Sequence, residues 1–499
     1  MKKYSDFMDE ISGDDLYDRL IGHGFFPEKL PPVLDATSFL ILCKISNPGF
    51  KKKSYDYIRF DSMRNINTPR ALGIPTPMAY EKLCSVLKAN WGNIQQHFHT
   101  HTDSQNHLIS RNHLQLHKYK DVLFEMNYDD WRSGGSPKDD LPLGMRFIVK
   151  ADISSCFPSI YTHSIPWALV GKSVSKEKRS EKKWFNKIDK ACQNLKDRET
   201  HGLLIGPHAS NLISEIILTV VDHILYDKGW RYIRNIDDYT CFVESREKAD
   251  CFITDLIDEL RKFDLTLNYR KTVITSLPNI SLEMWVRKLN SFSLLTSYGK
   301  VDYKQARAFF DLAIELMYTN GGNASVLNYA IKVLAGQKMT DNAKVYSWKT
   351  GMQLALIYPY LIPLMDNYVF SAYGVDKDVI DMFANKAFDD GIKTRNFEEC
   401  CYAIYYALKY DFNIRKLDAT DMVGINSCLL MLLTYLYYKK HGYVTSIEIM
   451  KKHAKSLVAK DLDRNWLFVY EVLEEVDLSD DWKVLKRKEI SFLKPEFQY

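Results

Sequence analysis

The sequence predicts an α+β protein whose central part mixes strands with helices and whose C-terminal part is all helical. Two observations carry this prediction. Segments between residues 145 and 268 are rich in β-branched and apolar residues and end at turn residues, which is typical of strands. After about residue 300, apolar residues recur three and four positions apart, which is typical of amphipathic helices. Because domains usually hold ~100–200 residues, we expect three units, residues 1–145, 146–295 and 296–499.

The composition excludes several classes of protein. Apolar residues make up 46% of the 499 positions and the formal net charge is only +4, so disorder is excluded and net charge alone does not indicate a nucleic-acid partner. The longest apolar run, Cys428 to Tyr438, is too short to cross a membrane, and the N-terminus turns acidic where an export signal turns apolar. The nine cysteines form no CxxC pair, which argues against zinc. We expect a cytoplasmic protein with no membrane partner.

The central region contains the predicted strands. A strand is predicted first, then a long buried helix, then two strands joined by a tight acidic turn, then a helix and a short strand. Their ranges are Met145–Ile153, Leu212–Tyr226, Arg231–Phe242, Ala249–Phe263 and Leu265–Asn268.

The C-terminal region repeats helical patterns with short connections, which suits an array of helix pairs. The predicted helices are Val301–Tyr318, Ala324–Ala335, Gly351–Tyr368, Asp376–Phe388, Phe397–Tyr410, Asp418–Lys440, Ser446–Ala459 and Arg464–Val476.

Acidic residues at the strand ends are the strongest chemical signal. Asp237 and Asp238 occupy a turn between two strands, and adjacent carboxylates in an apolar setting repel each other unless a cation intervenes. Asp152 ends the first predicted strand, so it meets Asp237 if the two elements are neighbours in one sheet. Mg²⁺ binds through few carboxylates plus substrate phosphates, and two such ions promote in-line phosphoryl displacement. This pattern favours nucleotidyl transfer.

Two further segments lie between and after these carboxylates. The stretch His201–Asn211 contains Gly202 and Gly206 and leads into a helix, which suits close approach of backbone to a phosphate. Lys271 follows the second acidic segment and could protonate a departing pyrophosphate or pair with a triphosphate. Taken alone, Lys271 is better explained as a solvated lysine at the end of a strand.

A basic stretch runs from Gly171 to Arg198. It holds ten lysines and arginines against four acidic residues, a local net charge of 10 − 4 = +6. Such a stretch is usually a solvated helix face. It becomes a phosphate site only if something nearby handles nucleotides.

Four of these segments resemble the palm motifs of reverse transcriptases. They occur in the family's order over about 120 residues: Asp152 to Ile160, Gly202 to Ser210, Asn235 to Asp238, and Leu267 to Thr272. The sequence departs from the pattern at Asn235, where the family usually has Tyr, and the glycine motif lacks its leading Gln.

A narrower resemblance is to the abortive-infection polymerases of the AbiK type, which bacteria and prophages carry as phage defence. It rests on Tyr161 to Trp167, Gly171 to Ser173 and Glu199 to Gly202. The resemblance implies a reverse-transcriptase-like palm and fingers without a usual thumb, followed by an α-helical, HEAT-like C-terminal domain. It also implies template-independent DNA synthesis from dNTPs, primed on a tyrosine hydroxyl, with single-stranded DNA left attached to the protein. A homo-oligomer, trimer or hexamer, is implied as well.

The reverse-transcriptase resemblance assigns roles to individual residues. Two Mg²⁺ ions, for which Mn²⁺ can substitute, would be held by Asp152, the Ile153 carbonyl, Asp237 and Asp238. The nucleotide would contact Phe157, Gly206 and Ser210. The ring of Phe157 would block a 2′-hydroxyl on the sugar. Lys271 would complete the catalytic set beside the triphosphate.

Two alternatives compete with this interpretation. One is a templated reverse transcriptase of the retron type, but residues 280–300 are too short to supply the thumb that holds a duplex. The other is a catalytically silent scaffold whose helices bind a phage protein, which the presence of all three aspartates disfavours. The priming tyrosine is not determined by the sequence. Loop candidates are Tyr4, Tyr17, Tyr55 and Tyr57.

Overall fold

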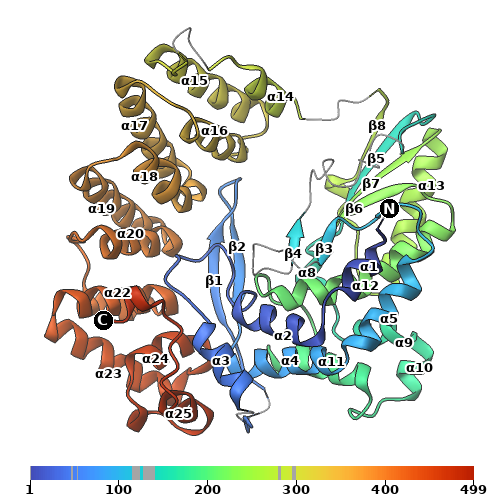
Figure 1. Ribbon diagram of the computed structural model, residues 1–499, viewed down its shortest axis with the longest axis horizontal. Helices are drawn as coiled ribbons and strands as arrows, with labels where there is room; N and C mark the ends of the chain where they lie inside the picture. The colour runs from blue at the N-terminus through green and yellow to red at the C-terminus, as the bar shows by residue number, and fades with distance from the viewer. Residues whose placement is uncertain are drawn as a thin grey trace.

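The structure is a computed structural model that describes residues 2–46, 49–52, 54–114, 124–126, 141–278, 283–294 and 299–499. Within these residues the chain is mostly helical, with one four-stranded and two two-stranded antiparallel sheets. The predicted α+β class is therefore confirmed. Figure 1 shows the four-stranded sheet on one side of the molecule and the C-terminal helices on the other, with the hairpin β1–β2 between them.

The four-stranded sheet has the order β6-β7-β5-β8. Its strands are Phe147–Asp152 (β5), Tyr232–Asn235 (β6), Asp238–Val243 (β7) and Val273–Ser276 (β8). Residues of β5 and β7 alternate between two faces, as the strand period of two requires. Val149, Tyr239 and Cys241 enter the large core, whereas Ile148 and Phe242 join a small cluster on the other face. Helices His208–Asp227 (α12) and Arg246–Arg261 (α13) pack beside the sheet (Figure 1).

The prediction of a strand at Leu265–Asn268 is wrong. Only Leu267 forms a bridge, to Ile153, and the fourth strand begins at Val273. The reason is that the backbone N–H of Asn268 donates to the Asp152 carbonyl at 2.7 Å and the chain then enters the short 3₁₀ turn η1, Tyr269–Lys271.

The N-terminal part consists of helices and two short hairpins. Its elements, with the four helices that follow β5, are Tyr4–Asp9 (α1), Gly13–Gly22 (α2), Thr37–Ile45 (α3), Ile58–Met63 (β1), Pro69–Ile74 (β2), Pro77–Ala89 (α4), Trp91–Thr102 (α5), Asn112–Leu114 (β3), Phe124–Met126 (β4), Cys156–Ser159 (α8), Ser164–Val170 (α9), Lys172–Glu177 (α10) and Trp184–Asn194 (α11).

The described residues from Tyr303 to Arg487 contain helices and no strand. With α14, which precedes them, these helices and helical turns are Met284–Ser291 (α14), Tyr303–Thr319 (α15), Ser325–Ala335 (α16), Asp341–Ile357 (α17), Pro359–Leu364 (η2), Asp366–Phe370 (η3), Ser371–Tyr373 (α18), Lys377–Thr394 (α19), Phe397–Tyr410 (α20), Ala419–Ile425 (α21), Cys428–His441 (α22), Val444–Lys460 (α23), Asp463–Asn465 (η4), Trp466–Val472 (α24), Glu475–Asp477 (η5) and Asp480–Arg487 (α25).

Two predicted helices are divided in the structure. The stretch 351–368 belongs to α17, η2 and η3, because Pro359 cannot continue an α-helix. The stretch 418–440 is split into α21 and α22 at Asn426, whose φ of 55° lies in the left-handed region that ends helices.

The C-terminal helices pack against the hairpin β1–β2 and the chain that precedes it. Glu398 in α20 accepts hydrogen bonds from the Ser62 hydroxyl at 2.7 Å and the Met63 N–H at 2.6 Å. Asp481 in α25 accepts one from the Tyr55 hydroxyl at 2.9 Å. Buried polar contacts of this kind hold the helical part against the hairpin.

Among the described residues, α12 is the one helix long and apolar enough to pass a test for a membrane span. In the structure 72% of its most apolar window is buried inside the protein. A core helix of a folded domain satisfies the same test, and α12 occupies such a position beside the sheet.

Candidate active site

Three carboxylates meet where β5 ends and the hairpin β6–β7 turns. Asp152, the last residue of β5, pairs in register with Asp238, the first residue of β7. The turn between β6 and β7 contains Asp237, whose carbonyl accepts a hydrogen bond from the Ile153 N–H at 3.1 Å. The sequence places Asp152 and Asp237 together only if β5 and the hairpin are neighbours, and the structure pairs β5 directly with β7.

The electrostatics of this cluster reflect its crowding. The pKa of Asp237 is raised to about 6, first because the carboxyl is buried and then because Asp238 and Asp152 lie close by. Burial and Asp152 raise the pKa of Asp238 as well. Lys271 and Lys150 oppose the shift at Asp238. Like charges held together in this way are stabilised by a cation.

Lys271 provides one such cation. Its Nζ lies 2.6 Å from Asp152 Oδ2, and Asn268 Nδ2 donates to the same oxygen at 3.2 Å. The Lys271 side chain is 59% exposed whereas that of Asp152 is 6% exposed. Lys271 can therefore leave Asp152 for an incoming anion while the carboxylate stays in place.

The donor set fits Mg²⁺ bound together with a phosphate ligand. Among the described residues, no group of three or more His, Cys, Asp or Glu side chains is arranged so that it could hold a metal ion. Mg²⁺ does not need such a group, because it is usually held by one or two carboxylates with waters and substrate phosphates. Asp152, Asp237 and Asp238 would supply these carboxylates, and burial together with the two neighbouring carboxyls raises the pKa of Asp237.

The other predicted nucleotide-binding residues lie on the segments that follow. Phe157 lies in α8, and its carbonyl accepts a hydrogen bond from the Leu203 N–H at 2.8 Å. Gly206 has a φ of 126°, and a Cβ there would lie 2.4 Å from Cγ of Pro27, so only glycine fits. Ser210 is 5% exposed in the first turn of α12. The structure thus joins the glycine segment to the Phe157 segment, while Ser210 faces the interior.

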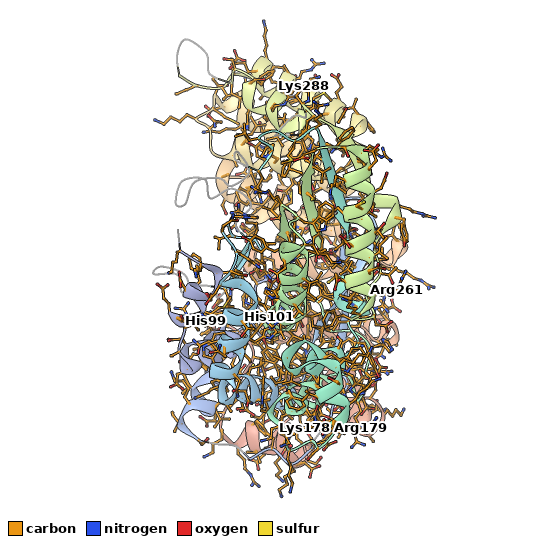
Figure 2. All side chains as sticks on the ribbon, turned by 90° about the vertical axis from the view of Figure 1, so that its right-hand side faces the viewer. His99, His101, Lys178, Arg179, Arg261 and Lys288 are labelled. Carbon is orange, nitrogen blue, oxygen red and sulfur yellow. The ribbon has the colours of Figure 1, made fainter. Side chains whose placement is uncertain are left out.

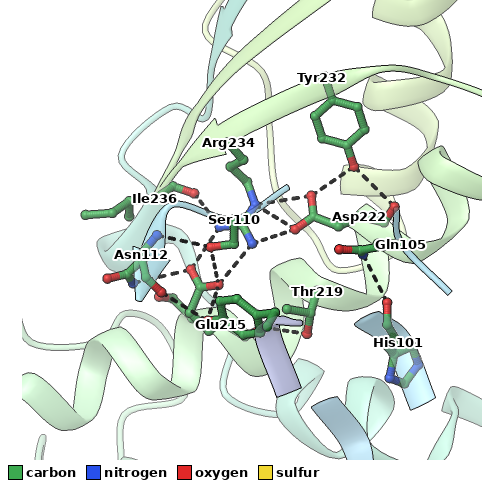
Figure 3. A network of polar contacts seen from close by, with 12 residues as sticks. His101, Gln105, Ser110, Asn112, Glu215, Thr219, Asp222, Tyr232, Arg234 and Ile236 are labelled. Carbon is green, nitrogen blue, oxygen red and sulfur yellow. Dashed lines mark hydrogen bonds and ion pairs between the residues drawn. The ribbon is translucent and has the colours of Figure 1, made fainter. Parts of the chain in front are cut away.

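A buried ionic network, which sequence reasoning missed, supports the acidic turn (Figure 3). Arg234 in β6 is fully buried, and its guanidinium forms ion pairs with Glu215 at 2.9 Å and Asp222 at 2.6 Å, both on α12. The side chains of Ser110, Asn112 and Tyr4 also donate to Glu215, and that of Tyr232 to Asp222.

Arg234 also reaches the turn itself. Its Nη1 donates to the carbonyl oxygen of Ile236 at 2.8 Å, directly before Asp237. Ile236 has a φ of 53°, a left-handed conformation that is strained for a β-branched residue. The guanidinium therefore anchors the backbone that presents Asp237. The available sequence signal is a pair of acidic residues, Glu215 and Asp222, seven positions apart in the mostly apolar middle of helix α12.

The chain has a distant structural similarity to telomerase, a reverse transcriptase, over most of its length. Apo telomerase from Candida tropicalis matches with a TM-score of 0.31 and 11% identity, over 84% of this chain and 68% of that chain. Telomerase from Candida albicans, in complex with a TWJ fragment of telomeric RNA, matches with a TM-score of 0.31 and 12% identity, over 80% and 64%.

The chain thus spans about two thirds of the length of these telomerases, and at such identities the similarity concerns the fold alone. No family model and no curated protein matches the chain.

The prediction of four loop tyrosines is corrected by the structure. Tyr4 and Tyr17 lie in helices α1 and α2, are 3% and 5% exposed, and bond to Glu215 and Glu81. Tyr55 is 1% exposed. Tyr57 alone is half-buried, and it lines a cavity of about 1120 Å³ between the hairpin β1–β2 and the C-terminal helices.

One exposed tyrosine lies on the 3₁₀ turn that carries Lys271. Tyr269 in η1 is 64% exposed and stands two residues before Lys271. This turn is tied to Asp152 by the ion pair of Lys271 and by the hydrogen bond from the Asn268 N–H to the Asp152 carbonyl.

Proposed function

We propose that the protein is a template-independent, protein-primed DNA polymerase that acts in abortive-infection defence against phage. The observation that carries the proposal is the meeting of Asp152, Asp237 and Asp238 at paired strand ends, with Lys271 on Asp152. This arrangement is what nucleotidyl transfer needs, and it lies on segments that resemble reverse-transcriptase motifs in their order.

The reaction joins a hydroxyl oxygen to the α-phosphorus of a dNTP. The new O–P bond replaces the bond between the α-phosphorus and its bridging oxygen, pyrophosphate leaves, and the hydroxyl proton passes to a carboxylate or to water. The carboxylates of Asp152, Asp237 and Asp238 and the Ile153 carbonyl would hold Mg²⁺, or Mn²⁺ in its place. The bound ion would supply positive charge to the attacking and leaving oxygens. Lys271, released from Asp152, would neutralise the pyrophosphate and supply a proton to it.

The substrate is proposed to be a deoxynucleotide. Phe157 lies on the segment after Asp152, where an aromatic ring would fill the space beneath the 2′ position of the sugar. The steric clash with a 2′-hydroxyl would then exclude ribonucleotides.

The first attacking hydroxyl is proposed to come from a tyrosine of the protein. The stretch between β8 and α15 contains one described helix, α14, of eight residues, which is short for a thumb that holds a duplex. Accessible candidates in the described N-terminal and central regions include the half-buried Tyr57 and the exposed Tyr269. The DNA would remain joined to the protein through a phosphodiester to the phenol oxygen.

The biological setting follows from the resemblance to the AbiK type. We place the protein in the bacterial cytoplasm, as a homo-oligomer, trimer or hexamer, with the C-terminal helices in a HEAT-like array that takes the place of a thumb.

The proposal is tested by incubating the purified protein with labelled dNTPs and Mg²⁺ and no nucleic acid. We expect a labelled product that migrates with the protein on a denaturing gel, and a nucleotide adduct on a tyrosine peptide after nuclease digestion. Product that separates from the protein and forms only when a primed template is added would favour the retron-type alternative. No incorporation under either condition would favour a silent scaffold that binds a phage protein.

A further inference from the structure

The motif segment Tyr161 to Trp167 and the basic stretch after it fold around one cavity, which the catalytic cluster does not use. The cavity measures about 550 Å³ and lies among α9, α10 and α11. Ligand pockets for nucleotide-sized molecules fall in the range of ~300–1,000 Å³. Figures 1 and 2 show α10 and the neighbouring Arg179 at the lower end of the molecule, whereas the four-stranded sheet is in its upper half.

One wall presents an oriented histidine. His163 Nδ1 lies 2.5 Å from Asp189 Oδ2, and Gln193 Nε2 donates to the other oxygen of Asp189 at 2.7 Å. Asp189 is buried, while the His163 side chain is 42% exposed. A carboxylate on Nδ1 fixes the ring and leaves Nε2 for a second partner. Among the described residues Nε2 of His163 has none, and both His163 and Asp189 line the cavity.

The opposite wall carries more positive than negative charge: Lys176, Arg179 and Lys190 line it with one carboxylate, Glu181, which lies 3.7 Å from Lys190 Nζ. Lys176 and Arg179 line the cavity, and neither has an ion-pair partner in the described part of the chain. Arg179 Nε donates to the Lys176 carbonyl at 2.9 Å, and Asn186 Nδ2 donates to the carbonyls of Lys178 and Ser180, so this loop has a defined shape. The Nη atoms of Arg179 and the ammonium of Lys176 remain as donors.

Aromatic rings form the third side. Tyr161 and Trp167 line the cavity, with ring centroids 5.7 Å apart, and Tyr161 stacks on His201 at 5.0 Å. Aromatic rings of this kind stack on nucleobases with little preference for sequence, and arginine and lysine beside them bind phosphate.

We propose that this cavity is a second nucleotide site, in which Lys176, Arg179 and, when both its ring nitrogens carry a proton, the Nε2–H of His163 donate to a phosphate, and Tyr161 and Trp167 hold the base. The proposal rests on the proposed function only for the choice of ligand. The ligand that the site would bind is a deoxynucleotide with a 5′-phosphate group. Such a group is present both in a free dNTP and at the 5′ end of a single DNA strand.

Binding is measured on the Asp237→Asn protein with EDTA present, so that neither incorporation nor Mg²⁺-dependent binding at the acidic cluster contributes. Two probes are titrated separately: dATP by calorimetry, and a 5′-phosphorylated, 3′-fluorescent oligothymidylate by anisotropy. Saturable binding of either probe supports the site and identifies the source. No saturable binding of either probe overturns it. Because this experiment measures binding and not catalysis, its result does not depend on whether the protein is a polymerase.

Matched variants locate the binding. Lys176→Ala with Arg179→Ala should weaken the bound probe at least ~10-fold, since each charged hydrogen bond lost contributes about that much. The control, Lys178→Ala with Lys182→Ala, removes equal charge from residues that do not line the cavity and should change affinity less than about twofold. Equal weakening by both pairs would show only a solvated basic face and overturn the proposal.

The histidine gives a second, conservative test. His163→Asn places an amide nitrogen where Nδ1 donates to Asp189 but removes Nε2, whereas His163→Gln keeps a donor near the Nε2 position. We expect weaker binding in the first variant and partial recovery in the second. Equal affinity of His163→Asn and the parent protein would contradict the role of Nε2.

Discussion

Replacement of Arg234 tests the link between the buried network and the acidic turn. Arg234→Met leaves Glu215 and Asp222, which are 1% and 2% exposed at their side chains, without their cation. Removing one partner of a buried ion pair costs ~3–5 kcal/mol, because an uncompensated charge stays behind. The bond to the Ile236 carbonyl is lost as well. Arg234→Lys keeps the charge but cannot reach both carboxylates and the carbonyl, so we expect a smaller loss, ~1–3 kcal/mol.

The assay combines urea denaturation, followed by tryptophan fluorescence, with dNTP incorporation. Since Arg234 holds the turn that presents Asp237, folded Arg234→Lys protein should lose kcat with little change in KM. Asp222→Asn is the matched control, because it removes a carboxylate of the same network and leaves Arg234 bound to Glu215 and Ile236. We expect incorporation by this variant to stay within about twofold of the parent. Folded Arg234→Lys protein with unchanged kcat would refute the anchoring role.

Two further changes have defined outcomes. Phe157→Ala should admit ribonucleotides while dNTP use survives, measured as the ratio of ATP to dATP incorporation; a parent protein that already uses both would contradict the steric block. Burial raises the pKa of Glu398 from 4.5 to about 7. The folded protein therefore binds a proton at this carboxyl more tightly than the unfolded chain does. This group's stabilising contribution is complete below its unfolded pKa of about 4.5 and is lost as the pH rises through about 7, by up to ~3 kcal/mol. Glu398→Gln, which can keep both bonds to Ser62 and Met63, should flatten the pH dependence of the urea midpoint; equal slopes in both proteins would exclude this origin.

The acidic cluster could be predicted because it depends on local pattern. Asp152 ends a strand and Asp237 lies at the turn of a hairpin, so the two carboxylates meet as soon as that strand pairs with the hairpin. Apolar strands of this length tend to pair in one sheet. The long helix α12 follows equally from its apolar run. Both predictions use information carried by a few consecutive residues.

The supporting network could not be predicted in the same way. Arg234 and Glu215 are nineteen residues apart, and they meet only because α12 packs under β6. Burial of tyrosines has the same origin. Tyr55 looks like a loop residue in the sequence, yet α25, more than four hundred residues later, supplies Asp481 as its partner. Tertiary packing decides such contacts, and local periodicity does not record them.

The most direct test of the account is the activity of Asp237→Asn protein. Asparagine keeps the shape of the side chain and removes the charge that would bind Mg²⁺, so the fold should persist. Incorporation of labelled dNTP with Mg²⁺ should fall to about a few per cent of the parent value or less, with an unchanged circular dichroism spectrum. Folded Asp237→Asn protein that retains a large share of the activity would contradict the assignment of this cluster as the site of nucleotidyl transfer.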